Sequence, residues 1–191
     1  MTGRLLLTLL ATTAGIFGQQ RVVEGLAESK VRVLIYEDLQ CTDCADFRRM
    51  MDDSLLPRYA ARVAFVHRDF PLAKHAWARK AAIAARYFAE QKPELGLAYR
   101  RQVMAGIRDT TNENFKDRLS QFARDHGLDP APAVAALDDA KLAALVERDF
   151  QDGVARGVAH TPTVFVNGQA FIEHISVEEI SEALDSALAG R

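Results

Sequence analysis

Residues 31–44 read VRVLIYEDLQCTDC, and this stretch decides the fold. Its first six residues, 31–36, are mostly apolar and β-branched, a composition typical of a buried strand. After four further residues the chain reaches Cys41 and then Cys44, which are its only two cysteines. Two cysteines placed at random in such a chain would lie three positions apart about 1% of the time, so this spacing needs a chemical explanation.

A helix and a second strand follow the first strand. Apolar residues recur at helical spacing from Phe47 to Leu55, which predicts a helix that begins near Cys41. Pro57 should kink or end this helix, because proline lacks a backbone donor. Residues 63–67, VAFVH, predict the next strand. Strand, helix and strand in this order predict a parallel pair with a right-handed crossover.

The middle of the chain is helical, and strands return near its end. Residues 76–149 show helical patterns and no strand signal, so we expect a helical insertion there. Two strand-like runs, 163–166 and 169–172, are joined by an Asn-Gly pair. That pair predicts a hairpin, because a type I′ turn needs positive φ at both central positions. A helix that runs to about residue 188 completes the chain.

The predicted fold class is α/β, with one domain formed by residues 21–75 and 150–191 around the insertion. Residues 1–20 are interpreted as a signal peptide or an N-terminal apolar segment. The uncharged run 5–17 is shorter than the roughly 20 residues that span a bilayer. Its alternatives are an amphipathic or buried helix, or a longer uncleaved anchor that associates with the membrane. We favour export to the periplasm or outside the cell, where disulfides persist.

Composition excludes several classes of protein. The chain is 49% hydrophobic and 26% charged, which favours a folded core over disorder. Its 24 basic and 26 acidic residues give a net charge of −2 without a long basic run. This balance argues against nucleic acid as a partner and against a polybasic membrane patch. Two cysteines also cannot build a multi-bridge scaffold or a four-cysteine zinc site.

The cysteine pair predicts redox chemistry. Cysteines three residues apart in the first turn of a helix have Cα atoms roughly 5.5 Å apart, which suits a disulfide. Cys41 would face the free N–H groups of the helix start, which stabilise a thiolate and lower the pKa of the thiol. Cys44 would lie one turn further in and be more buried. We therefore predict Cys41 as the attacking thiol and Cys44 as the resolving thiol of thiol–disulfide exchange.

Two structural alternatives explain the pair less well. A static disulfide would close a very short loop and add little stability. A metal site would need two more ligands, and none of the five histidines has the spacing of a paired ligand motif. We therefore predict no metal and no organic cofactor, because the cysteines carry the electrons themselves.

Three motifs together resemble the DsbA-like thiol–disulfide oxidoreductases of the thioredoxin superfamily. They are CTDC at 41–44, RDFPL at 68–72 and GVAHTPTVFVNG at 157–168. The resemblance covers nearly all of the chain from residue 31 onward. It implies a thioredoxin-like fold, β-α-β followed by β-hairpin-α, with an inserted helical subdomain. It also implies an enzyme that exchanges disulfides with protein or peptide thiols and a redox partner protein.

The resemblance assigns two residues near the end of the chain. Pro162 corresponds to the cis-proline that faces the active-site cysteines in thioredoxin-like proteins. Thr161 would then present backbone groups to a substrate segment beside Cys41. Taken alone, Pro162 would be interpreted as an ordinary proline at the start of a strand.

Several positions depart from the family and are candidates for tuning the pair. Thr42 and Asp43 stand where relatives often have proline and then histidine or tyrosine. The charge of Asp43 should oppose ionisation of Cys41, so we predict a milder oxidant. His160 replaces a glycine of many relatives, and it would either donate a hydrogen bond or positive charge to the thiolate or only fill a surface notch.

A buried acid of better-known members, six residues before the first cysteine, is here Ile35. Glu37 and Asp38 lie nearer the motif and would supply or accept protons in its place. The sequence alone favours the alternative that both are exposed loop carboxylates.

Two other functions stay open beside the oxidase-type exchange enzyme. The first is a reductase or isomerase of the same fold, which a partner keeps reduced. The second is a non-catalytic, chaperone-like binding module in which the helical insertion holds unfolded chains.

Overall fold

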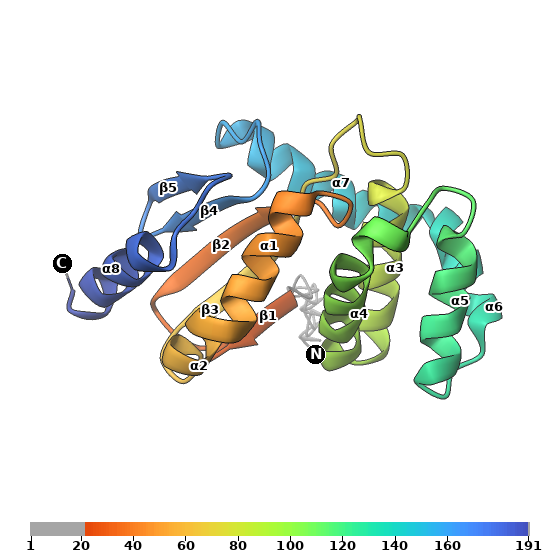
Figure 1. Cartoon of the computed structure of the whole chain (residues 1–191), viewed down its shortest axis with the longest axis horizontal. Helices are drawn as coiled ribbons and strands as arrows, with labels where there is room; N and C mark the ends of the chain where they lie inside the picture. Colours follow the sequence, from red (N-terminus) through yellow and green to blue (C-terminus); the bar gives the residue numbers. More distant parts are fainter. Residues whose placement is uncertain (1–21, 191) are drawn as a thin grey trace, which may run out of the picture.

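The described part of the chain, residues 22–190 of the computed structural model, folds around a mixed sheet of five strands (Figure 1). The strands lie in the order β1-β3-β2-β4-β5. Strands β2 and β3 are parallel, as predicted, and the other neighbouring pairs are antiparallel. The bounds are β1 Val22–Gly25, β2 Arg32–Glu37, β3 Ala64–Asp69, β4 Thr163–Val166 and β5 Gln169–Ile172.

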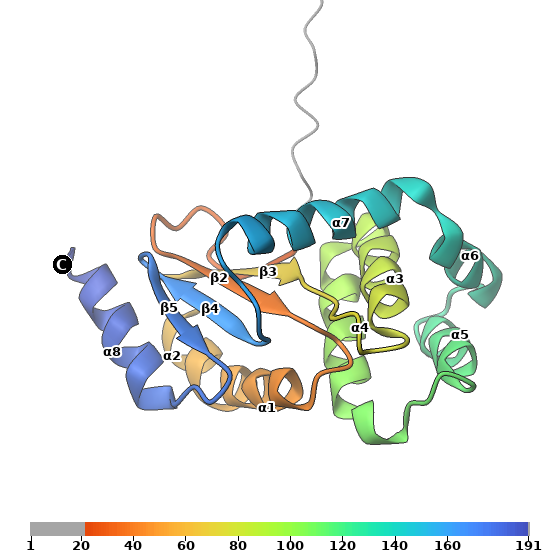
Figure 2. The same cartoon turned by 90° about the horizontal axis from the view of Figure 1, so that it is seen from above.

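Helices cover both faces of the sheet (Figure 2). One face carries α1 (Thr42–Met50), the π-helical turn η1 (Met51–Leu55), the short α2 (Leu56–Tyr59) and α8 (Val177–Leu188). Their apolar side chains share a core with the sheet that includes Phe47, Met51, Leu55, Val33, Ile35, Val164, Ile180 and Leu184. The opposite face is covered by α7 (Ala140–Ala155), from which Phe150 stacks on Phe70 with ring centroids 4.6 Å apart.

The first helix begins where the sequence predicts, but Pro57 does not end it. Cys41 is the N-cap of α1, which confirms a helix start at that residue. Pro57 lies in the first turn of α2, directly after the π-helical turn. Helical backbone continues through Pro57 to Tyr59, and the departure from α-helical geometry is the π-helical turn that precedes the proline.

The remaining helices form a layer beside the sheet (Figure 1). They are α3 Ala78–Gln91, α4 Pro93–Ala105, α5 Phe115–Asp125 and α6 Pro130–Ala135, with short 3₁₀ turns η2 Ile107–Asp109 and η3 Ala136–Asp138. Their core holds Phe88, Tyr99 and Phe122, whose rings contact one another. Helix α7 runs from this layer across the sheet, so the expected limit between residues 149 and 150 falls inside one helix.

The end of the chain follows the prediction, and its beginning adds a strand. Asn167 and Gly168 have φ values of 48° and 84°, as the predicted hairpin turn between β4 and β5 requires. The architecture is the thioredoxin-like one that the resemblance implied. Strand β1 was not predicted, because its sequence VVEG holds only two apolar residues and no hairpin signal adjoins it.

The signal peptide or apolar segment expected at residues 1–20 lies outside the described residues. Among the helices of residues 22–190, none combines the length and the apolar character that a membrane span needs.

Candidate active site

The two cysteines lie at the start of α1, directly after the end of β2. A tight turn joins the two elements, in which the Cys41 N–H donates to the Asp38 carbonyl at 3.0 Å. As N-cap, Cys41 leaves its sulfur beside the free N–H groups of the first helical turn. Its exposed fraction is 8%, against 1% for Cys44, and both are free thiols. The structure therefore gives the outer and inner placement that the spacing predicts.

The two sulfurs have opposite acid–base properties. The pKa of Cys41 is lowered to about 6. The hydrogen bond from the Cys44 thiol is the largest cause, and the Thr161 side chain and the backbone N–H groups of Cys44 and Asp43 add to it, while burial opposes it. Burial raises the pKa of Cys44 well above its ordinary range, and the hydrogen bond to Cys41 raises it further. At neutral pH Cys41 is therefore the thiolate and Cys44 the thiol.

Thr161 contacts Cys41 from the loop before β4. In the thiol form, Cys41 Sγ donates to the Thr161 carbonyl at 3.3 Å. A thiolate has no proton to donate, so ionisation breaks this bond. The Thr161 hydroxyl is buried without a hydrogen-bond partner in the described part of the chain, and it is near enough to lower the pKa of Cys41.

The sheet places the Thr161–Pro162 peptide beside the cysteines. Tyr36 at the end of β2 pairs with Thr163 at the start of β4, so the residues just outside both strands meet at one edge. The Thr161–Pro162 bond is cis, as the resemblance implied.

The preference for exposed carboxylates at positions 37 and 38 is wrong. Glu37 and Asp38 are 3% and 1% exposed. The Asp38 carboxylate accepts from Gln40 N–H at 2.7 Å and lies 2.8 Å from His75 Nδ1, so it fixes the turns on both sides of the site. The Asp38 N–H also donates to Cys44 Sγ at 3.4 Å. These carboxylates are buried because β2 ends beneath the helical layer, which a local sequence pattern does not show.

Buried ion pairs behind the site were not predicted. His67 lies 2.8 Å from both Glu37 and Glu24, and Arg100 of α4 donates to Glu37 at 2.7 Å and pairs with Asp69. Burial alone would raise the pKa of Glu37, but the charges of His67 and Arg100 lower it. The signal in the sequence is the ionisable run 67–69 at the end of an apolar strand, since buried charges require partners.

The other tuning candidates lie at the mouth of the site. A hollow of about 370 Å³ opens beside Cys41, and its walls include Asp43, Lys74, His160, Thr161 and Glu173. His160 Nδ1 lies 3.1 Å from Glu173, and within residues 22–190 no hydrogen bond joins His160 to Cys41.

Two further placements complete the site. Thr42 is exposed in the first turn of α1. In the part of the chain described, no group of three or more His, Cys, Asp and Glu side chains is arranged to hold a metal ion.

Comparisons with known proteins agree with this architecture. A family model described as thioredoxin matches residues 18–186. Oxidised BdbD from Bacillus subtilis is 21% identical with a TM-score of 0.77, over 90% of this chain and 95% of that one. A periplasmic thioredoxin-like protein from Salmonella enterica serovar Typhimurium is 18% identical with a TM-score of 0.75, over 91% and 93% of the two chains.

Curated relatives are longer proteins. A Na(+)/H(+) antiporter NhaA from Herminiimonas arsenicoxydans is 26% identical over 169 residues, which are 88% of this chain and 26% of the antiporter. The chain spans about a quarter of the length of the curated relatives that it matches.

Proposed function

Because the chain belongs to the thioredoxin family, we propose that it is a thiol–disulfide oxidoreductase that exchanges disulfides with protein or peptide thiols. The observation that carries this proposal is the difference between the two sulfurs. Cys41 has a pKa of about 6 and lines an open hollow, whereas the pKa of the buried Cys44 is raised. Exchange requires an ionised, accessible attacker and a protected second thiol. The proposal also agrees with the fold shared with BdbD.

The reaction follows from these properties. The Cys41 thiolate attacks one sulfur of a partner disulfide, and the other partner sulfur leaves as a thiolate. Cys44 then loses its proton and attacks the Cys41 sulfur of the mixed disulfide. This attack releases the second partner sulfur as a thiol. Two electrons pass from the protein to the partner, and the same steps in reverse oxidise a partner dithiol. The cysteines carry these electrons, so the proposed reaction needs no metal and no organic cofactor.

The surrounding residues have supporting roles in this proposal. Thr161 and Pro162 position the partner segment beside Cys41, and the Thr161 hydroxyl stabilises the thiolate. Burial raises the pKa of Cys44, and the hydrogen bond to Cys41 and the negative charge of Glu37 raise it further, so this thiol stays protonated until the mixed disulfide forms. Thr42, Asp43 and His160 surround the entrance, where they tune the reactivity of Cys41.

The compartment and the partner are part of the same proposal. The apolar run 5–17 has the length of a signal-peptide core, and one similar structure is a periplasmic protein. We therefore place the reaction in the periplasm or outside the cell, with a second redox protein that restores the starting state of the cysteines. The antiporter activity of the curated relatives is not assigned to this chain.

A trapping experiment tests the proposal. Cys44→Ala removes the resolving thiol, so mixed disulfides through Cys41 should accumulate in the native compartment and disappear on reduction. Cys41→Ser is the matched control and should trap none, because Cys44 is buried and protonated. If Cys41→Ser retains the protein's effect on its clients, the binding-module alternative is correct and the proposed enzyme is not.

A further inference from the structure

The opening beside Cys41 continues into a second hollow. The first, the inner hollow, has Cys41 among its lining residues. The second, the outer hollow, has about 400 Å³ and lies between α1 and the loop that precedes α8. Asp43 and Glu173 line both hollows. The two therefore form one groove that leads away from Cys41 between a pair of carboxylates.

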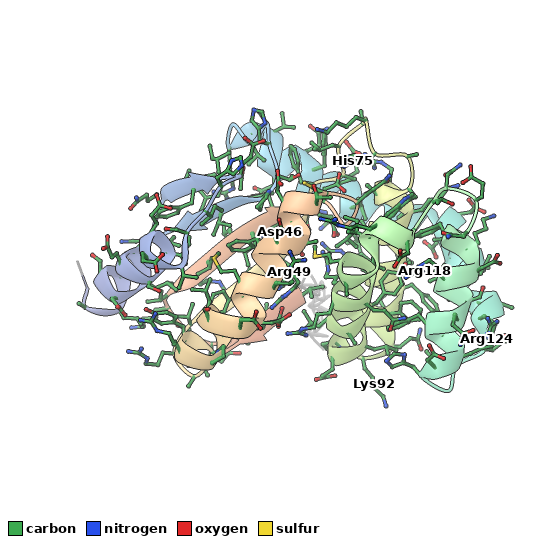
Figure 3. All side chains as sticks on the ribbon, viewed as in Figure 1. Asp46, Arg49, His75, Lys92, Arg118 and Arg124 are labelled. Atoms are coloured by element: carbon green, nitrogen blue, oxygen red, sulfur yellow. The ribbon has the colours of Figure 1, made fainter. Side chains whose placement is uncertain are left out.

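The groove has an excess of negative charge. Among residues 22–190, the Asp43 carboxylate has no hydrogen-bond or ion-pair partner, and it lines both parts of the groove. Glu173 lies 3.1 Å from His160 Nδ1. Asp46 pairs with Arg49, and both lie on the outward side of α1 (Figure 3). Lys74 is the one lysine or arginine that lines either described hollow.

Apolar surface lies beyond the carboxylates. Phe47, Met50 and Ile175 line the outer hollow, with Met50 and Ile175 half-buried. A lysine or arginine side chain can lay its apolar stem on such a surface while its charged end reaches a carboxylate. The groove thus offers both parts of the environment that a long cationic side chain prefers.

We infer that this groove selects partner segments that carry lysine or arginine beside the reactive cysteine, with Asp43 and Glu173 as the specificity-determining residues. The inference rests on the proposed function, because a partner sulfur bonded to Cys41 brings its neighbouring residues into the groove. Both carboxylates attract a cationic segment as it approaches and while it lies in the groove, so they increase the rate at which Cys41 attacks the partner sulfur. Salt should weaken the preference, because both side chains are reached by solvent.

Three peptides of one sequence test this selection. Each carries a single cysteine in a disulfide with thionitrobenzoate, and its two flanking residues are lysine, glutamine or glutamate. The reduced protein attacks the peptide sulfur, thionitrobenzoate leaves as a coloured thiolate, and Cys44 then releases the peptide thiol. At low salt we expect the lysine peptide to react about tenfold faster than the glutamate peptide. At about 0.5 M NaCl the two rates should approach each other.

The ratio of the lysine-peptide rate to the glutamate-peptide rate separates charge selection by the groove from the reactivity of Cys41. A change in Cys41 itself alters the rates for all three peptides and cancels in the ratio. Asp43→Asn combined with Glu173→Gln should reduce the ratio to about twofold or less. Glu28→Gln removes a negative charge at an exposed position on the β1–β2 loop, away from the groove, and should leave the ratio unchanged.

The outcomes separate this inference from the proposed function. If all three peptides react at equal rates, the groove does not select for charge, although disulfide exchange stands. If Glu28→Gln lowers the ratio as much as the double variant does, net charge is the cause and the assignment of Asp43 and Glu173 is wrong. If no peptide reacts, the proposed function fails, and the inference fails with it.

Discussion

Asp43 stabilises the neighbouring thiolate through its backbone N–H. We expect its carboxylate, a nearby negative charge, to oppose this effect. The resulting pKa of about 6 lies between the roughly 7 of thioredoxin and the roughly 3.5 of DsbA. A more stable thiolate favours the dithiol form and makes the disulfide a stronger oxidant. We therefore expect a reduction potential between about −270 and about −120 mV.

Removing the charge of Asp43 should make the protein more oxidising. Asp43→Asn keeps the backbone N–H and the shape of the side chain, so the Cys41 pKa should fall further. A fall of about one pKa unit corresponds to a potential about 30 mV less negative. Equilibration with glutathione buffers measures the potential, and Asp46→Asn, whose carboxylate already pairs with Arg49, is the control. An unchanged or more negative potential for Asp43→Asn would contradict this account of the dipeptide.

At the scale of single elements, the order of strands and helices was predictable, but the burial of the side chains that follow a strand was not. Apolar runs and the Asn-Gly pair marked β2, β3 and the β4–β5 hairpin, because these signals are local. The burial of Glu37 and Asp38 depends on α4 and the loop at 70–77, which come from 30 or more residues away in the chain. Local sequence patterns therefore predicted the position of the cysteines correctly, but they wrongly predicted that the carboxylates beside them are exposed.

The hairpin turn provides a direct test at this scale. Gly168 has a φ of 84°, and a Cβ there would meet no atom within 4 Å, so only backbone conformation opposes a side chain. Gly168→Ala should lower the free energy of unfolding by about 1 kcal/mol. Asn167→Gly is the control and should change it by less than about 0.5 kcal/mol, because glycine accepts a φ of 48°. Equal effects of the two substitutions in urea unfolding would show that the turn does not constrain the hairpin.

At the scale of the whole molecule, buried ion pairs join the helical layer to the sheet. Arg100 of α4 binds Glu37 and Asp69 at the ends of β2 and β3. Arg86 of α3 binds Asp69 and also Asp149 of α7, so one network connects three helices with two strands. Paired charges of this kind fix the relative positions of elements more than they add stability. The inserted helices thus hold in place the buried carboxylates that lie behind the cysteines.

Breaking this network should be costly. Arg100→Met removes a cation that is 1% exposed and leaves Glu37 and Asp69 buried without it, so we expect a loss of about 3–5 kcal/mol in the free energy of unfolding. The same substitution at Arg49, whose pair with Asp46 is exposed, should cost less than about 1 kcal/mol. Urea denaturation of the reduced proteins measures both values. Similar losses for the two variants would show that the buried pairs do not hold the layers together.

The ionisation of Cys41 is the premise of the whole account, and alkylation of the reduced, folded protein measures it directly. Iodoacetamide reacts with thiolates, so its rate at each cysteine, followed by peptide mass analysis over a range of pH, reports which sulfur is ionised. Cys41 should be modified half-maximally near pH 6, little below that pH and fully above it, while Cys44 stays unmodified until the protein unfolds. A midpoint near the ordinary thiol value of about 8.5 for Cys41, or equal modification of Cys44, would contradict the account.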